Sequence, residues 1–251
     1  MSTPKKRLDV LLTELGLAPS RERAQGLILS GNVLVNDVPQ TKAGLAVAEN
    51  SVIRIRGQEH PYVSRGGIKL KAAIDYFSIS VSGKTALDIG ASTGGFTEVL
   101  LMEGAAKVFA VDVGHNQMDW KIRNDPRVVC FEKINARSIE FSLIGQKVDI
   151  IVADVSFISL EKIFPALIQF STPETCWITL VKPQFEVGRE KVGKGGIVTS
   201  EEDRADAVKR LTAFSETLGL MRQGLIDSPI TGTNGNREYL AFWKHQGPSG
   251  S

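Results

Sequence analysis

The sequence contains little cysteine and histidine, and it has no hydrophobic run long enough to cross a membrane. Its two cysteines, Cys130 and Cys176, each sit in an apolar run typical of a strand, so we expect buried, reduced thiols. The three histidines have no ligand spacing to a cysteine, which argues against a structural zinc site. The longest apolar stretches, such as residues 148–155, hold about eight residues, whereas a spanning helix needs about 20.

The first residues also lack the apolar run of a secretory signal, although Lys5-Lys6-Arg7 give them a basic start. We therefore expect a cytoplasmic protein with no membrane partner. Hydrophobic residues make up 42% of the chain and charged residues 23%, which is typical of a folded globular protein. The 251 residues allow one large domain, or a large domain and a small one.

Positive charge is concentrated at the front of the chain. Residues 1–71 carry a net charge of +5, and the remainder carries −3. A basic segment on a nearly neutral body favours a polyanionic partner for that segment. A solvated basic face remains the alternative from charge alone.

Residues 1–59 are predicted to form a small α+β domain. Leucines at helical spacing predict a helix over 8–15, and Ser20 is placed to begin a second helix over 21–30. Short strands are expected at 33–35 and 52–55. Pro61 and the Gly66-Gly67 pair then indicate a linker over 60–67.

Strands alternate with helices in the domain expected over residues 68–246. This order predicts an α/β fold of the Rossmann-like type, with a mostly parallel seven-stranded sheet covered by helices on both faces and a final antiparallel strand. The strands are expected at 85–89, 107–111, 128–132, 148–153, 175–181, 220–227 and 238–243, and the main helices at 68–77, 95–103, 160–169 and 200–218. Residues 247–251 are expected to be a flexible tail.

A glycine-rich turn follows the first strand of this domain and leads directly into a helix. Glycines at such a turn let the backbone approach a ligand closely. The turn matches neither the dinucleotide pattern nor a Walker loop, so an adenosine ligand without a pyrophosphate fits better, and S-adenosyl-L-methionine is the common one. A turn without a ligand is the alternative. The predicted cofactor residues are Asp88, Gly90, Ala91, Ser92, Thr93, Gly94, Gly95, Phe96, Asp112, Asn135 and Ala136.

The predicted cofactor residues outside the glycine-rich turn each have an expected place around the ligand. Asp88 should face its amino-acid end, Asp112 should bind the ribose hydroxyls, and Asn135 and Ala136 should contact adenine. Three further charged residues are expected at the same edge of the sheet: Asp154 and Lys182 end neighbouring strands, and Glu238 begins the antiparallel one. Taken singly, each could be a strand-end charge that points into water.

At these motifs the sequence resembles the TlyA (hemolysin A) family, a group of FtsJ-like RNA 2′-O-ribose methyltransferases. The resemblance covers about residues 5–245 and rests on Asp88 to Thr97, Asp154 to Ser159, Leu180 to Glu186 and Arg237 to Tyr239. It implies a Lys-Asp-Lys-Glu catalytic set made of Lys69, Asp154, Lys182 and Glu238. Transfer of a methyl group to a ribose hydroxyl needs a base near that hydroxyl, and a lysine can serve when its surroundings suit it.

The resemblance also implies the substrate, which would be ribosomal RNA or a ribosomal subunit with cytidine as the target nucleoside. Residues 1–59 resemble the RNA-binding domain of the ribosomal-protein-S-four type, through Ser20-Arg21 and the turn at 31–36. We also consider a catalytically silent rRNA-binding or assembly factor and a membrane-lytic protein, but the intact motifs disfavour the first and the missing spanning segment disfavours the second.

The residues predicted to contact RNA come from both domains. Phe157 could stack on a base taken out of its helix, or it could be a core phenylalanine. Lys191 and Lys194 are expected in a mobile loop that touches phosphates. The full set is Lys5, Lys6, Arg7, Ser20, Arg21, Arg23, Lys42, Arg65, Arg137, Phe157, Lys191 and Lys194.

Overall fold

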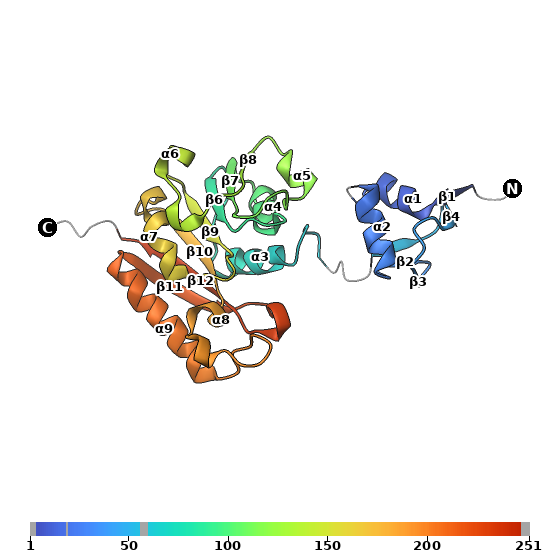
Figure 1. Cartoon of the computed structure of the whole chain (residues 1–251). Helices are drawn as coiled ribbons and strands as arrows, with labels where there is room; N and C mark the ends of the chain where they lie inside the picture. Colours follow the sequence, from blue (N-terminus) through green and yellow to red (C-terminus); the bar gives the residue numbers. More distant parts are fainter. Residues whose placement is uncertain (1–3, 19, 56–59, 247–251) are drawn as a thin grey trace. The chain divides into compact units, whose positions relative to one another are not determined.

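The computed structural model describes residues 4–18, 20–55 and 60–246, and the chain divides into two compact units (Figure 1). The small unit is Met1–Pro61 and the large unit is Tyr62–Ser251. The tail predicted for residues 247–251 lies outside the described residues. No helix in the described ranges combines the length and the apolarity that crossing a bilayer requires.

In the small unit, two short helices pack around a core formed by Leu8, Leu12 and Ile28, which are fully buried. Its elements are β1 (Lys5–Arg7), α1 (Leu8–Glu14), α2 (Arg21–Leu29), β2 (Val33–Val35), β3 (Val38–Gln40), β4 (Ala46–Ala48) and β5 (Ile53–Ile55). Strand β1 pairs antiparallel with β4, while β2 lies between β3 and β5. The sequence did not indicate β1, because its run of basic residues has no alternation of apolar and polar side chains.

The large unit is built on a seven-stranded sheet in the order β11-β12-β10-β9-β6-β7-β8. Its strands are β6 (Thr85–Ile89), β7 (Lys107–Val111), β8 (Val128–Phe131), β9 (Ile150–Ala153), β10 (Cys176–Val181), β11 (Leu220–Asp227) and β12 (Tyr239–His245). Strands β6 to β10 pair in parallel, and β12 runs antiparallel to both of its neighbours. The predicted mostly parallel sheet with a final antiparallel strand is confirmed.

Helices cover both faces of this sheet. Residues of α3 and α4 join one core cluster, and residues of α7 and α9 join the cluster on the opposite face. The α-helices are α3 (Gly66–Tyr76), α4 (Gly95–Met102), α5 (Trp120–Arg123), α6 (Phe141–Ile144), α7 (Phe164–Leu167), α8 (Pro183–Glu186) and α9 (Glu201–Thr217), and the 3₁₀ turns are η1 (Ala136–Ser138), η2 (Leu160–Lys162), η3 (Ile168–Phe170), η4 (Arg189–Lys191) and η5 (Thr233–Gly235).

Several helix predictions need correction. The single helix expected over 160–169 is broken into η2, α7 and η3, since Pro165 has no N–H to continue a helix begun before it. Helix α3 begins at Gly66, so the two glycines assigned to the linker lie in its first turn. The four-residue helices α5, α6 and α8 were missed, because one turn is too short to show helical periodicity.

Strand β6 lies at the point where the strand order reverses. The chain passes from β6 outward to β7 and β8, then returns to the other side of β6 as β9 and continues to β10. At such a reversal the connections leave the carboxyl ends of the strands in opposite directions, which opens a crevice there. The site is therefore expected beyond Ile89, Ala153 and Val181.

Candidate active site

The glycine-rich turn joins β6 to α4 and touches the end of β9. Gly90 has a φ of 83°, in the left-handed region that favours glycine. A Cβ atom at Gly90 would collide with the backbone oxygen of Asp154, and Gly94 has a φ of 97°. Both glycines are thus required by the backbone path, and the first brings the turn against the segment that carries Asp154.

Asp112 fastens this turn to the end of β7. Its carboxylate accepts hydrogen bonds from the backbone N–H of Ser92 at 2.8 Å and of Gly114 at 2.6 Å. Each carboxylate oxygen has a further lone pair, so these contacts leave room for ribose hydroxyls. The predicted role of Asp112 in sugar binding stays a prediction.

Asp88 lies beneath the turn and is fully buried. One carboxylate oxygen accepts a hydrogen bond from Thr97 Oγ1 at 2.6 Å, and the other has no partner among the described residues. Burial raises the pKa of Asp88 to about 7, because the charged form loses its hydration. Asp88 lines neither cavity described below, so its predicted contact with the ligand remains a prediction.

Two adjoining cavities open at this edge of the sheet. Their volumes are about 540 and 410 Å³, and both are lined by Gly90, Ser92 and Asp154. The larger has many apolar walls, and its lining includes Asp112, Asn135, Ala136 and Arg137. The smaller is lined by Ala91, Thr93, Gly95, Phe96 and charged side chains. A ligand with a flat apolar end and a charged end would fit this pair of cavities.

Two lysine–carboxylate pairs line the smaller cavity. Lys69 Nζ, on α3, lies 2.6 Å from Glu238 Oε2, and Lys182 Nζ lies 2.6 Å from Asp154 Oδ1. Lys182 also donates to Ser156 Oγ at 2.9 Å. Lys69, Lys182 and Glu238 are buried, so each charge depends on its partner, because a lone buried charge is strongly destabilising. The structure brings together all four residues that the family resemblance selected.

The sheet register explains this convergence. Val181 is the register partner of Tyr239 in the antiparallel pair β10–β12, so Lys182 and Glu238 are adjacent at the strand ends. A Cβ atom at Gly232 would collide with the carboxylate of Glu238, so a larger residue at this point of the preceding loop would displace that carboxylate. Gly232 and Ser156 were not predicted. The only sequence signal for Gly232 was the turn-rich composition of residues 231–236. Ser156 lies within residues 154–159, one of the motifs that carry the family resemblance.

Phe157 stands at the rim of the larger cavity with 92% of its surface exposed. The alternative of a core phenylalanine is therefore wrong. Its φ of 64° is unusual for a bulky side chain, and its ring centroid lies 5.2 Å from that of Phe185 on α8. Strained backbone at an exposed aromatic residue points to function rather than to packing.

Glu186, which the sequence did not single out, ties together the segments that follow β9 and β10. It is buried, and its carboxylate accepts hydrogen bonds from Ser159 Oγ at 2.6 Å and from Leu160 N at 2.9 Å. Burial raises the pKa of Glu186. This cross-link fixes the short segment that carries Phe157.

The loop with Lys191 and Lys194, expected to be mobile, is fastened to its surroundings. Lys191 Nζ lies 2.6 Å from Asp203 Oδ1, and the side-chain amides of Asn234 and Asn236 donate to the carbonyl groups of Gly195 and Gly196, each at 2.8 Å. Lys194 is exposed. Both lysines are on the surface, but the ammonium group of Lys191 is paired with Asp203.

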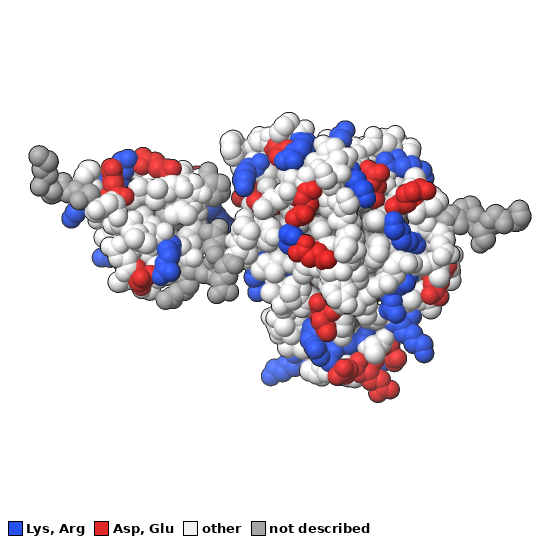
Figure 2. Space-filling model, turned by 180° about the vertical axis from the view of Figure 1, so that it is seen from behind, with Lys and Arg blue, Asp and Glu red and all other residues white. Residues whose placement is uncertain are grey.

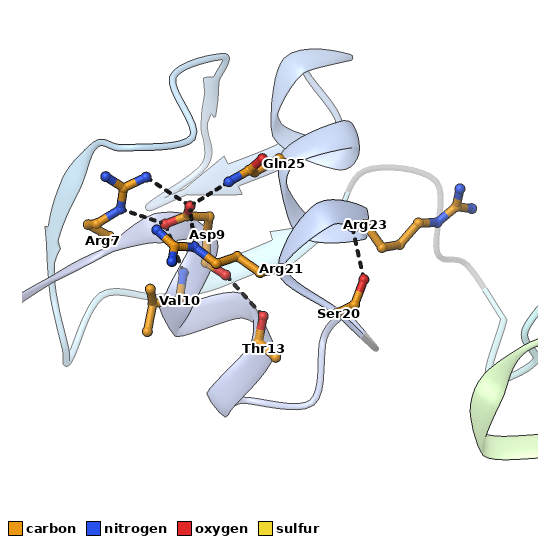
Figure 3. Close-up of polar contacts among 8 residues, drawn as sticks. All are labelled: Arg7, Asp9, Val10, Thr13, Ser20, Arg21, Arg23 and Gln25. Atoms are coloured by element: carbon orange, nitrogen blue, oxygen red, sulfur yellow. Dashed lines mark hydrogen bonds and ion pairs between the residues drawn. The ribbon is translucent and has the colours of Figure 1, made fainter. Parts of the chain in front are cut away.

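In the small unit, several predicted RNA-binding residues also hold the fold. Lys6 donates to Glu14 at 2.8 Å, and the hydroxyl of Ser20 caps α2 by accepting from Arg23 N at 3.2 Å. Arg7 and Arg21 both contact Asp9 (Figure 3). The remaining ones, Lys5, Arg23 and Lys42, have exposed side chains, and Arg65 lines the smaller cavity of the large unit.

Basic and acidic side chains are interspersed on the face of the large unit that Figure 2 shows. The visible face therefore offers no broad patch of a single sign there. No group of three or more potential metal ligands occurs among the described residues.

Comparisons with known proteins agree with this geometry. Residues 62–245 match the FtsJ-like methyltransferase family, and residues 6–53 match the S4 domain. The chain is 44% identical to the 16S/23S rRNA (cytidine-2′-O)-methyltransferase TlyA of Mycobacterium tuberculosis, over 96% of this chain and 91% of that protein. It is also 44% identical to hemolysin A of Brachyspira hyodysenteriae, over 94% of this chain and 99% of that protein. A solved structure from Streptococcus thermophilus has a TM-score of 0.75 at 40% identity, covering 98% of this chain and 90% of that one.

Proposed function

Because the chain belongs to the FtsJ-like methyltransferase family, we propose that it uses S-adenosyl-L-methionine to methylate a ribose 2′-hydroxyl of ribosomal RNA, with cytidine as the target nucleoside. Residues 68–246 carry the catalytic function, and residues 1–59 bind RNA. Residues 60–65 connect the two, because the last two residues of the expected linker, Gly66 and Gly67, belong to α3.

The convergence of two lysine–carboxylate pairs beside the glycine-rich turn carries this proposal. Lys69, Asp154, Lys182 and Glu238 come from four separate segments, and all four line one cavity together with Gly90. Two buried ion pairs at a sheet edge add little net stability to the fold, because the cost of desolvating the charges offsets most of their attraction. Their placement at the reversal of strand order supports a catalytic role.

Proton removal from the ribose hydroxyl is assigned to Lys182. In its neutral form the amine would accept the proton of the 2′-hydroxyl while that oxygen attacks a methyl group held in line with it, and the bond from that methyl group to the cofactor sulfur breaks. Asp154 and Ser156 hold the amine in place, as their contacts at 2.6 and 2.9 Å suggest. Lys69, oriented by Glu238, supplies a second positive charge beside the reacting oxygen.

The two cavities suit the cofactor. When bound, S-adenosyl-L-methionine would supply a methyl group on a sulfonium sulfur, which is a good leaving group because it departs as a neutral thioether. The apolar cavity at Asn135 and Ala136 would hold adenine, Asp112 the ribose, and the turn with Asp88 beneath it the amino-acid end. Holding methyl and hydroxyl in line contributes as much to the rate as removal of the proton.

RNA contacts are assigned to both units. Phe157 would stack on the target base at the rim, and the phosphate contacts would be Arg137 in the same cavity, Arg65 in the smaller cavity and Lys194 in its exposed loop. In the small unit the assigned set is Lys5, Lys6, Arg7, Ser20, Arg21, Arg23 and Lys42, and Lys191 completes the set in the large unit.

The test is methylation mapping. Purified protein is incubated with ribosomal RNA, or with ribosomal subunits, and methyl-labelled cofactor, and ribose methylation is mapped by nucleotide. We expect 2′-O-methylcytidine with the wild-type chain and none with Lys182→Ala. Cofactor binding without methylation of any RNA would favour a silent RNA-binding factor. Leakage from liposomes without methylation would favour a lytic protein.

A further inference from the structure

A buried carboxylate in the small unit accepts hydrogen bonds from Arg7 and Arg21, two of the residues predicted to bind RNA. The side chain of Asp9, on α1, is 0% exposed. Its Oδ1 accepts from Arg7 Nε and from Val10 N, each at 3.0 Å, and its Oδ2 accepts from Arg7 Nη2 at 2.9 Å. Oδ2 also accepts from Arg21 Nε at 3.0 Å and from Gln25 Nε2 at 2.9 Å. Figure 3 shows these donors gathered around the carboxylate.

The two arginines arrive from different elements and share one oxygen atom. Arg7 ends β1 and Arg21 begins α2, yet both contact Oδ2 of Asp9, so the guanidinium groups lie side by side (Figure 3). Their side chains are 50% and 54% exposed. Arg21 uses Nε for this contact, which leaves the N–H groups of its terminal nitrogens for another acceptor.

The charges of Asp9, Arg7 and Arg21 leave this cluster with a net positive charge. The hydrogen bond from Arg7, helped by Gln25 and Arg21, holds the pKa of Asp9 well below its usual range, so the carboxylate stays ionised at neutral pH. One buried negative charge faces two half-exposed positive charges, which leaves a net positive charge on the outer side. A planar guanidinium with free N–H groups matches the oxygens of a phosphate.

We propose that Asp9 is a positioning residue that holds Arg7 and Arg21 as a two-armed site for one phosphodiester group of RNA. The inference rests on the proposed RNA-binding function of the small unit. A carboxylate under two arginines reduces their positive potential, so it cannot help RNA binding through charge. Its benefit is to fix two flexible side chains before the RNA arrives, which removes part of the entropic cost of binding.

Charge and positioning predict changes of opposite sign in the RNA affinity of Asp9→Asn. The substitution keeps the shape of the side chain, removes a negative charge and puts an amide NH₂ where two donors now point. If only charge mattered, RNA would bind more tightly and with a steeper salt dependence. If positioning matters, binding weakens by about tenfold, and the slope of log Kd against log salt becomes shallower by roughly one phosphate contact.

The experiment measures Kd of the full chain for an RNA hairpin of mixed sequence at several salt concentrations. The variants are Asp9→Asn, Arg21→Lys, the pair of both, and Gln25→Met as a matched control that removes one Asp9 donor but neither arginine. We expect weaker binding for Asp9→Asn and Arg21→Lys, no further loss in the pair, and nearly wild-type binding for Gln25→Met.

Four results would overturn the proposal. Tighter binding by Asp9→Asn would mean that charge alone matters. If Asp9→Asn weakens RNA binding by the same factor in the wild-type chain and in the Arg21→Lys variant, Asp9 supports the fold and does not position Arg21. If hydrogen exchange shows that Asp9→Asn unfolds α1 and α2, the Arg21→Lys variant provides the test instead. A wild-type Kd and a wild-type salt slope for Arg21→Lys would then rule out a two-armed site. Unchanged binding in Arg7→Ala and Arg21→Ala would remove the RNA role itself, whereas the methylation test judges the catalytic proposal separately.

Discussion

Lys182 Nζ lies 2.6 Å from Oδ1 of Asp154, although the two residues follow different strands of the sheet. The parallel pairing of β9 with β10 makes this contact possible, because both strands end at the same edge. Ser156 Oγ, at 2.9 Å from the same nitrogen, gives the ammonium group a second fixed partner. The position of this amine is thus set before any RNA arrives.

Replacement of Lys182 by alanine should therefore remove activity without removing the cofactor site. A well-placed general base contributes about 10²- to 10⁴-fold to a rate, so we expect a loss of that size in kcat for Lys182→Ala. Calorimetric titration with S-adenosyl-L-methionine should give nearly wild-type affinity. Lys209→Ala, on the exposed side of α9, serves as the control for loss of a lysine. Normal turnover by Lys182→Ala would disprove its assigned role.

Gly90→Ala tests the approach of the turn to Asp154. The new Cβ atom meets both an unfavourable φ and the Asp154 backbone oxygen. Gly145→Ala is a matched control, because Gly145 has a φ of 73° but nothing within 4 Å of an added Cβ. The control should lose about 1–2 kcal/mol of stability through φ alone, whereas Gly90→Ala should lose more and bind S-adenosyl-L-methionine at least about tenfold more weakly. Thermal unfolding and calorimetry measure the two effects, and equal behaviour of both variants would contradict the prediction.

Asp88→Asn should change how stability depends on pH. The pKa of Asp88 is about 7 in the folded chain, against about 3.9 for an unperturbed Asp. A raised carboxyl pKa contributes stability that is fully present below the unfolded pKa and is lost as pH rises through the folded pKa. The asparagine variant has no such loss, so its Tm relative to wild type should rise between about pH 4 and pH 7. A Tm difference that stays constant over this range would show that folding does not raise the pKa of Asp88.

Phe157 should show opposite effects on stability and activity. Phe157→Gly removes an exposed ring from a residue with a φ of 64°, so we expect an unchanged or slightly higher Tm. Loss of base stacking, worth about 1–3 kcal/mol, should lower methyl transfer roughly 5- to 150-fold at limiting RNA. Phe157→Tyr, which keeps the ring, should retain most of the activity. If Phe157→Gly methylates RNA as well as wild type, stacking by this residue is ruled out.

Local sequence patterns were sufficient for the strands of the large unit and for the residue types of the site, but not for β1, β3 and β4 of the small unit. The strand limits Thr85–Ile89 and Lys107–Val111 agree with the structure, because a buried parallel strand is a short apolar run bounded by turn residues. The glycine-rich turn was also recognisable from the sequence, because a strand that leads through several glycines directly into a helix is typical of a ligand-binding turn. Lys69 entered only through the family resemblance, because no local pattern separates a catalytic lysine on a helix from a solvated one.

Tertiary structure decided everything that depends on contacts between distant segments. The sequence determined which residues form β10 and β12, but only their antiparallel register brings Lys182 beside Glu238, whose carboxylate occupies the space that a side chain at position 232 would need. In the same way, Asp9 is one acidic residue among several in sequence, and the packing of α1 against α2 makes it the shared acceptor of two arginines. Periodicity and composition reflect the local preferences of a segment, namely its backbone conformation and which of its faces is apolar. Ion pairs, steric clashes and side-chain exposure depend instead on which distant residues the fold packs against that segment.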